Sequence, residues 1–354
     1  MHIQDFQQSL AAIGAQPCHI GRITRAWLQG RPLGDGTRRQ KSEHYYPLSV
    51  RQGLPAIIEQ MGTLARIESQ HPAADGSLRL LVALADGQMV ESVLLPRDGL
   101  CVSSQVGCAV GCRFCMTGQS GLLRQLGSAE IAAQVALARQ LRPVRKVVFM
   151  GMGEPSHNLD SVLEAINLLG TDGQIGHKNL VFSTVGDLRV FERLPQQAVK
   201  PALALSLHTT RADLRASLLP RAPRLTPQQL VELGEDYARQ VGYPIQYQWT
   251  LLAGINDSQA EMDALVQLLR GKYAILNLIP YNSLETDAFQ RPSAAQIDRM
   301  KRHLHQYGVL TKVRDSAGQD IDGGCGQLRA RAAGLIDSSR LRRRQPAGTP
   351  RPAD

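Results

Sequence analysis

The feature of this sequence that most restricts its fold is an alternation of short apolar runs with longer amphipathic stretches. Strands are predicted at Lys146–Met150, Leu180–Ser183, Ala202–His208, Ile245–Leu252 and Ile275–Pro280, with helices between them, for example at Ala129–Leu141, Thr226–Val241 and Ala260–Leu269. Apolar strands that alternate with amphipathic helices form βαβ units around a parallel sheet. The pattern therefore predicts the α/β class. With about six such units, a full or partial (β/α) barrel fits better than a two-domain doubly wound sheet.

The same pattern divides the 354 residues into four predicted regions. Residues 1–95 are expected to be an accessory region, in which two short amphipathic helices, a loop over residues 31–53 and β-hairpins with Asp-Gly turns follow one another. Residues 96–316 are the barrel, and residues 317–337 are a C-terminal segment that contains Cys325. Residues 338–354 are rich in Arg and Pro, and we expect a disordered basic tail.

The net charge of +9, from 40 Lys and Arg against 31 Asp and Glu, favours a polyanionic partner such as RNA. No apolar run approaches the roughly 18 residues of a membrane helix, and the N-terminal MHIQDFQQ has no apolar core of a signal peptide. We therefore expect a cytoplasmic protein with no membrane association. Six cysteines in such a protein indicate metal or redox chemistry rather than structural disulfides.

Four of these cysteines, Cys101, Cys108, Cys112 and Cys115, lie in the stretch CVSSQVGCAVGCRFC. The last three have the spacing Cys-x3-Cys-x-Phe-Cys, which can hold three irons of a four-iron, four-sulfur cluster and leave the fourth iron open to bind and split a small molecule. The alternative is a structural zinc site made by all four. Their separations of seven, four and three residues fit no common zinc pattern.

Polar or Gly-rich residues follow the apolar strands directly. In (β/α) barrels, function lies at the C-terminal ends of the strands. The cysteine loop follows a short predicted strand near Leu100–Val102, so all these groups would converge on one mouth. These groups are Gly151–Pro155, Ser183-Thr184, Ser206–His208 and Tyr281-Asn282. Taken singly, each group could equally cap the end of its strand or bind a ligand.

Six motifs occur in order between Glu91 and Leu328: ESVLLP, CVSSQVGCAVGCRFCMTG, VVFMGMGEP, SLH, NLIPYN and DIDGGCGQL. In these motifs the sequence resembles the RlmN/Cfr family of radical S-adenosylmethionine (SAM) RNA methyltransferases. The resemblance implies that Cys108, Cys112 and Cys115 bind a [4Fe-4S] cluster, one per chain, whose open iron is chelated by SAM. Phe114 would pack against the bound nucleoside. The residues implied to form the SAM pocket are Gly153, Glu154, Ser183, Ser206, Leu207, His208 and Asn282.

The resemblance also implies three catalytic residues. Cys325, among the glycines of GGCGQL, matches the cysteine that carries the methyl group; Cys101 matches the thiol that resolves the covalent RNA intermediate through a transient disulfide; and Glu91 matches the proton acceptor. One SAM would methylate Cys325, and a second would generate the radical that activates this methyl group. The acceptor would be an adenine ring carbon, C2 in preference to C8, in ribosomal and/or transfer RNA. A flavodoxin or ferredoxin would donate the electron, and we expect a monomer.

Two alternatives remain open from the sequence: a radical SAM enzyme that acts on a small molecule or peptide, and a non-catalytic RNA-binding module whose cysteines hold zinc. The N-terminal helical region is shorter than is usual in the family, and we expect RNA specificity to come from surfaces outside the active site. Cys18 matches no family residue and is expected to be a small buried apolar residue.

Overall fold

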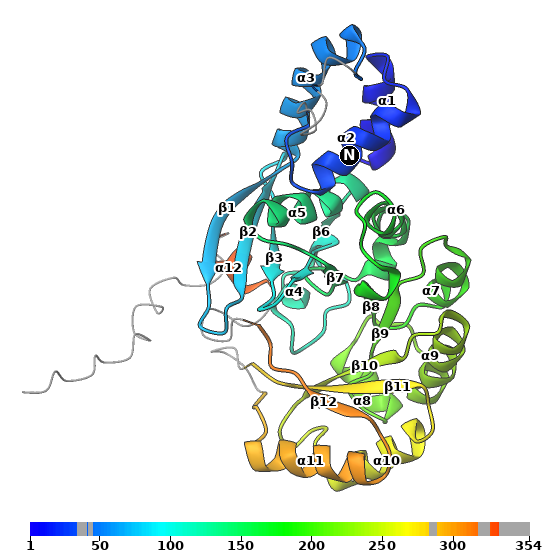
Figure 1. Cartoon of the computed structure of the whole chain (residues 1–354). Coiled ribbons are helices and arrows are strands. Elements are labelled where there is room, and N and C mark those ends of the chain that lie inside the picture. Colours follow the sequence, from blue (N-terminus) through cyan, green and yellow to red (C-terminus); the bar gives the residue numbers. More distant parts are fainter. Residues whose placement is uncertain (34–40, 42–44, 283–288, 318–325, 333–354) are drawn as a thin grey trace, which may run out of the picture.

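The computed structural model describes residues 1–33, 41, 45–282, 289–317 and 326–332. In this part of the chain, one ten-stranded sheet forms the centre of the molecule (Figure 1). Its strands, in spatial order, are β1 (Ala65–Pro72), β2 (Leu78–Leu84), β3 (Met89–Leu94), β4 (Gly99–Cys101), β7 (Lys146–Phe149), β8 (Leu180–Thr184), β9 (Ala202–Ser206), β10 (Ile245–Leu251), β11 (Ala274–Pro280) and β12 (Thr311–Val313).

The sheet changes from antiparallel to parallel at β4. β1 to β4 pair antiparallel in sequence order, whereas each neighbouring pair from β4 and β7 through to β12 is parallel. β1 and β12 are the two edges among the described strands, so the sheet is a partial barrel. The α/β fold class is confirmed, and the five predicted strands agree with the structure to within two residues at each end. The short strand β12 was not predicted.

Helices cover the outer face of the parallel part (Figure 1). Alternate residues of a strand face opposite sides of the sheet. On the outer side, residues such as Leu205, Trp249 and Leu278 are fully buried between the sheet and the helices. The opposite, inner face carries smaller side chains such as Ala204. The described α-helices between residues 126 and 310 are α5 (Ser128–Leu141), α6 (Leu159–Gly170), α7 (Leu188–Arg193), α8 (Ala212–Leu218), α9 (Pro227–Val241), α10 (Gln259–Leu269) and α11 (Ala294–Gln306).

Three helices at the N-terminus, α1 (Ile3–Ala12), α2 (Pro17–Leu28) and α3 (Leu48–Leu64), pack together above the barrel (Figure 1). The first two match the prediction. The predicted loop over residues 31–53 is wrong from Leu48 onward, because α3 begins there. Gly53 and Pro55 lie within this helix. Its buried side chains recur at the helical spacing of three or four residues, and they are Val50, Leu54, Ile57, Met61 and Leu64. None of the described helices is long and apolar enough to cross a bilayer.

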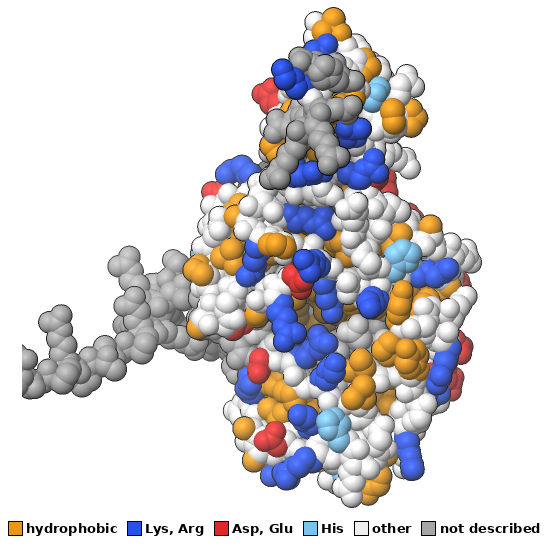
Figure 2. Space-filling model, in the orientation of Figure 1, with side chains coloured by type: hydrophobic (Ala, Val, Ile, Leu, Met, Phe, Trp, Pro, Cys, Tyr) orange, Lys and Arg blue, Asp and Glu red, His pale blue; other side chains and the backbone are white. Residues whose placement is uncertain are grey.

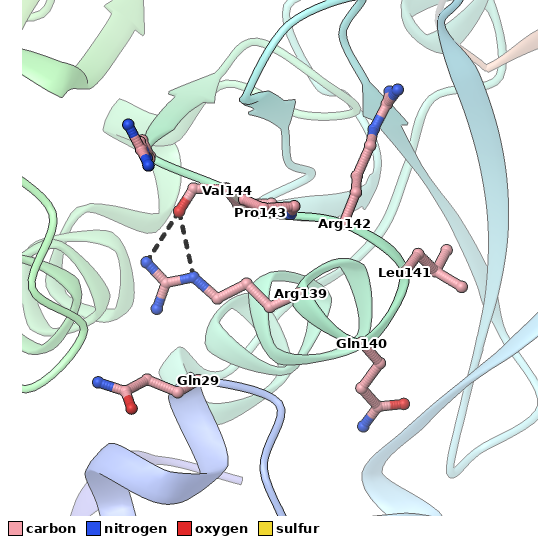
Figure 3. Close-up of a pocket in the computed structure, with 8 residues that line it drawn as sticks. Gln29, Arg139, Gln140, Leu141, Arg142, Pro143 and Val144 are labelled. Atoms are coloured by element: carbon pink, nitrogen blue, oxygen red, sulfur yellow. Dashed lines mark hydrogen bonds between the residues drawn. The ribbon is translucent and has the colours of Figure 1, made fainter.

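Arg139 connects these helices to the barrel. Its guanidinium donates to the carbonyl oxygens of Leu28 (2.9 Å), Val144 (2.9 and 3.2 Å) and Gly173 (3.0 Å). It lines a hollow of about 290 Å³ between the end of α2 and the α5–β7 connection (Figure 3). This hollow adjoins the N-terminal end of β7, the opposite end of the strand from Gly151–Pro155.

Candidate active site

The cysteine loop is held by a small hairpin. β5 (Gln105–Gly107) pairs antiparallel with β6 (Leu122–Gln125), and the loop between them includes the short helix α4 (Met116–Gln119). The N–H of Cys108 donates to the carbonyl oxygen of Gly121 over 2.8 Å, which fixes the first cysteine at the end of the hairpin. Gly107 has a φ of +86°, and a Cβ there would lie 1.9 Å from the same oxygen. Only glycine fits at this position.

An apolar wall surrounds the loop. Cys108 is buried, and Cys112 and Cys115 are half-buried. Burial raises the pKa of the Cys108 thiol to about 12, and burial together with the neighbouring Cys115 and Cys108 raises the pKa of Cys112. These thiols are therefore neutral without metal, and a bound iron would have to displace their protons. The wall consists of Val110, Val185, Leu218, Leu219, Leu252 and Tyr281.

The three cysteines lie on one loop without converging on a single point. In the described part of the chain, no three His, Cys, Asp or Glu side chains converge closely enough to hold a single metal ion. Each cysteine of a four-iron cluster binds a different iron, so the sulfurs need not meet at one point.

The C-terminal ends of β4 and β7 to β11 share one edge because these strands are parallel. A cavity of about 370 Å³ extends from this edge into the inner face of the sheet, within the range of roughly 300–1,000 Å³ typical of small-molecule sites. Its walls include Cys101, Phe114, Met150, Thr250 and Asn282. The structure thus brings one thiol, one aromatic ring and one carboxamide of the predicted site to the same cavity.

Glu154 follows β7 and is 5% exposed. Its carboxylate accepts from the N–H groups of Ser156 (3.1 Å) and Val185 (3.0 Å), so it joins the ends of β7 and β8. Burial raises the pKa of Glu154, although these hydrogen bonds oppose the shift. A cationic ammonium beside this carboxylate would favour its ionised form. Gly153 precedes it at φ +105°, where a Cβ would lie 2.7 Å from the side chain of Gln105.

His208 is buried in a left-handed conformation, with φ +64°. Its Nδ1 accepts from the N–H of Thr250 (3.0 Å), so the proton of the neutral ring lies on Nε2. Burial, with a contribution from Arg215, lowers the pKa of His208 to about 3. The ring makes an edge contact with Phe114, with 4.9 Å between centroids. His208 therefore acts here as a neutral support for the aromatic ring of the cysteine loop.

The remaining predicted SAM residues differ in what they present. Ser183 and Ser206 are half-buried on the inner face, in line with Ala204 and Gln248. Leu207 is fully buried and its side chain belongs to the main hydrophobic core, so only its backbone could reach a ligand. The Nδ2 of Asn282 is buried and has no hydrogen-bond partner among the described residues, and it faces the cavity. Such a donor fits a polar ligand.

Glu91 and Cys101 lie on the same face of neighbouring strands. Val93 of β3 pairs with Cys101 of β4, and Glu91, two residues before Val93, points to the same side. Glu91 is 1% exposed, whereas a hairpin carboxylate would ordinarily be solvated. Its carbonyl oxygen accepts from the hydroxyl of Ser103 at 2.6 Å, which fixes the strand at the edge of the cavity.

Cys325 lies outside the described residues, but the next residue is placed. At Gly326, with φ +93°, a Cβ would lie 2.5 Å from the Oγ1 of Thr117, two residues after Cys115. Helix α12 (Gln327–Ala332) packs against β3 and α4, and the N–H of Arg329 donates to Glu91 Oε1 at 2.9 Å. The chain that follows Cys325 therefore contacts both the cysteine loop and Glu91.

Comparison with known proteins decides the family. The model of the radical SAM superfamily matches residues 102–266. A protein of Chromobacterium violaceum named probable RNA methyltransferase is 77% identical over 98% of this chain and 99% of its own length, and one of Stutzerimonas stutzeri with the same name is 73% identical over 97% and 100%. This chain belongs to the radical SAM methyltransferases. The crystal structure of a radical SAM methyltransferase from Sphaerobacter thermophilus superposes with a TM-score of 0.78 at 32% identity, over 92% of this chain and 97% of that one.

Radical SAM methyltransferases use a [4Fe-4S] cluster and SAM, and the residues of this chain fit both. Three cysteines on an apolar-walled loop suit the cluster. The adjoining cavity suits a polar ligand such as SAM, because the Nδ2 of Asn282 has no partner within the part of the chain that the structure describes. An enzyme of this family is not the non-catalytic zinc-holding module considered from the sequence.

Sequence reasoning missed Arg215 of α8. It is 3% exposed and donates to the carbonyl oxygens of Val185 and Ser206 (3.1 Å), so it joins the ends of β8 and β9. Burial lowers its pKa to about 10, while Cys112 and Glu154 act in the opposite direction. This cation can therefore balance negative charge on Cys112 and Glu154 in the candidate site. The sequence RADLRASL carries no signal that this arginine, unlike Arg211, is buried.

The prediction for Cys18 is wrong, because its side chain is exposed on α2. The buried face of α2 consists of Ile23, Thr24, Trp27 and Leu28.

Proposed function

We propose that this methyltransferase acts on RNA and methylates an adenine ring carbon, C2 rather than C8, in ribosomal and/or transfer RNA. The observation that carries the proposal is the convergence of three parts of the chain: the cysteine loop, Glu91, and the helix that follows Cys325. The relatives named probable RNA methyltransferase and the net charge of +9 support RNA as the substrate.

Basic side chains beside the cysteine loop support a polyanionic substrate. Arg113, in the loop itself, is exposed and donates to Ser217 Oγ (3.3 Å), and the exposed Arg221 donates to the carbonyl oxygen of Ala109 (3.1 Å). Figure 2 shows Lys and Arg side chains in a band down the middle of one face of the barrel, with few acidic side chains among them. Phosphates would bind to such a surface and position the RNA without specifying its sequence.

Aromatic ring carbons of adenine are not nucleophilic, so polar methyl transfer from SAM would fail there. When bound, the cluster and SAM supply a radical that activates a methyl group. Cys108, Cys112 and Cys115 would hold the cluster, and Glu154, Ser183, Ser206, the backbone at Leu207, His208 and Asn282 would orient SAM, with Gly153 permitting the close turn beside it.

Three residues of the chain would handle the methyl group and the proton. The thiolate of Cys325 would accept the methyl group and carry it to the base. Glu91, kept from water at 1% exposure, would accept the proton that leaves the ring carbon. Cys101 on the neighbouring strand would attack the sulfur of Cys325 and break its bond to the methylene carbon. A disulfide forms, the carbon takes up a proton to become the methyl group of the base, and the RNA is released. A cellular thiol reductant would then restore both cysteines.

The target base must leave its stack to reach Glu91 and Cys101, which are 1% and 7% exposed, so we expect an unstacked or flipped adenine. We further propose a cytoplasmic monomer that receives its electron from a flavodoxin or ferredoxin.

The test is mass spectrometry of nucleosides from ribosomal and transfer RNA of a deletion strain. We expect one methyladenosine to disappear, to return with the wild-type gene and with Cys18→Ala, and to stay absent with Cys325→Ala. Cys18→Ala is the matched control because Cys18 is exposed on α2, remote in sequence from every proposed site residue. The position of the methyl group is read from the retention time against C2- and C8-methyladenosine standards.

An unchanged set of methylated nucleosides would refute RNA as the substrate and favour the small-molecule or peptide alternative. If the deletion strain loses the nucleoside but the gene with Cys325→Ala restores it fully, RNA remains the substrate and the methyl-cysteine route is refuted.

A further inference from the structure

A buried ion pair lies beside the proposed active site. The Nη1 of Arg79, on β2, is 3.3 Å from Oε2 of Glu91, on β3, and the two side chains are 2% and 1% exposed. Arg79 pairs in register with Val93, which pairs with Cys101, so the three residues form one row across the inner face. The ion pair therefore adjoins the cavity.

Each partner of this pair also binds one end of the same stretch of chain. The Nη2 of Arg79 donates to the carbonyl oxygen of Ala317 (3.2 Å), and Oε1 of Glu91 accepts from the N–H of Arg329 (2.9 Å). Cys325 lies between Ala317 and Arg329 in the sequence. The two hydrogen bonds thus tie both flanks of the cysteine segment to neighbouring positions on two adjacent strands.

We propose that Arg79 is a positioning residue: with Glu91 it clamps both flanks of the segment that carries Cys325. The proposal rests on the function proposed for Cys325 and extends it to a residue that takes no part in the chemistry. The term clamp refers below to Arg79 and Glu91 with their bonds to Ala317 and Arg329.

Stability alone does not account for the clamp. A buried ion pair loses its hydration, and replacing such pairs by apolar side chains is often neutral or stabilising. The pair instead fixes positions, because the planar guanidinium of Arg79 donates to the carboxylate of Glu91 and to the carbonyl oxygen of Ala317 at once. The first turn of α12 has N–H groups without partners within the helix, and Glu91 satisfies one of them.

A third contact lies close to the cysteine. Gly326 sits against the backbone and hydroxyl of Thr117, where any larger residue would collide. The residue next to Cys325 is therefore held by the cysteine loop, while the clamp holds points further out on both sides. Together the three contacts hold described residues on both sides of Cys325 against the inner face of the sheet and the cysteine loop.

The clamp also links positioning to proton transfer. Glu91 is both the proposed proton acceptor and the residue that holds Arg329. Charge-assisted hydrogen bonds are about twice as strong as neutral ones. A proton moving from the ring carbon to Glu91 would remove the carboxylate charge, weaken its bonds to Arg79 and Arg329, and loosen the segment after the proton has left the base. Substitution of Glu91 would change both roles together, so Arg79 is the residue that separates them.

Hydrogen–deuterium exchange of the full-length, cluster-loaded protein tests the clamp without reference to activity. Arg79→Gln removes the charge and one of the two donors that the fork directs. We expect amide exchange in residues 326–332, which include α12, to become about tenfold faster, as the loss of a hydrogen bond to a charged group predicts. Arg79→Lys retains the charge beside Glu91 and should restore part of the protection. Arg139→Gln is the control, since Arg139 also donates to carbonyls but in another part of the fold.

The coupling of SAM consumption to methylation gives the second readout. If Arg79 positions Cys325, then Arg79→Gln should still cleave SAM but form about tenfold more 5′-deoxyadenosine per methylated adenine. Faster exchange with an unchanged ratio of 5′-deoxyadenosine to methylated adenine would refute the positioning role of Arg79. The contacts of the clamp would then exist without being needed by Cys325. Faster exchange together with no methylated RNA even from the wild-type protein would refute the proposed function only. Exchange that is unchanged, or that rises equally throughout the sheet, would overturn the clamp itself.

Discussion

The hairpin that begins the cysteine loop offers a quantitative test, because two of its glycines share a positive φ but differ in the space around them. Gly107 and Gly121 both have positive φ, +86° and +69°, but a Cβ at Gly107 would lie 1.9 Å from the Gly121 carbonyl oxygen, whereas a Cβ at Gly121 meets nothing within 4 Å. Gly121→Ala should therefore cost only the backbone strain of a left-handed alanine, about 1–2 kcal/mol.

Gly107→Ala should add two further terms to the same strain. Relief of the collision costs about 1–3 kcal/mol, as overpacking does elsewhere, and the hydrogen bond from Cys108 N to Gly121 O, 2.8 Å long, is lost at about 0.5–1.5 kcal/mol. We expect the free energy of unfolding of Gly107→Ala to be about 1.5–4.5 kcal/mol below that of Gly121→Ala. Because this hydrogen bond fixes Cys108, iron binding should also fall.

The assay is anaerobic urea unfolding of the metal-free variants, followed by iron and sulfide analysis after reconstitution. Equal unfolding free energies and equal iron contents for the two variants would refute the claim that the hairpin fixes the first cysteine.

Two pH-dependent predictions follow from Glu154 and His208. Burial raises the folded-state pKa of Glu154, so the stability that its protonated form contributes is present below its ordinary pKa and is lost as the pH rises through the raised value. The free energy of unfolding should therefore decline less with rising pH in Glu154→Gln than in the wild type. An equal decline in the two proteins would contradict this. The folded-state pKa of His208 lies at about 3, below its ordinary 6.5, so its contribution is present above pH 6.5 and is lost as the pH falls. In His208→Asn, the asparagine can adopt the left-handed conformation and still accept a hydrogen bond from the N–H of Thr250. Between pH 6.5 and 5, its free energy of unfolding, measured with urea, should fall by about 1–2 kcal/mol less than that of the wild type. Identical curves for the two proteins would show that His208 does not take up a proton on unfolding.

The strand–helix alternation predicted the parallel part of the fold well, because fully buried strands such as β9 are continuous apolar runs that the sequence displays directly. Helix α3 was missed for a local reason. Gly53 and Pro55 signal a turn, but the packing of Val50, Leu54 and Ile57 against the other N-terminal helices outweighs the low helix propensity of these two residues.

Within the site, the cysteine spacing and the strand ends could be read from the sequence, since parallel strands bring their C-terminal ends together by geometry alone. The environments of the individual side chains could not. Arg79 follows Leu78 in an ordinary-looking strand, and only the register of β2 against β3 places it beside Glu91. Arg215 and Arg211 belong to the same short stretch of sequence, and tertiary packing decides that the first is buried and the second exposed.

Anaerobic Mössbauer spectroscopy of the iron-loaded protein, recorded with and without SAM, tests the central claim most directly. Three cysteine ligands leave one iron of four available, so we predict a [4Fe-4S] spectrum in which SAM shifts the signal of a single iron site. Substituting alanine for any one of Cys108, Cys112 and Cys115 should abolish this spectrum, while Cys18→Ala should leave it unchanged. A protein that assembles no cubane cluster, or a cluster whose four irons are all unaffected by SAM, would contradict the account.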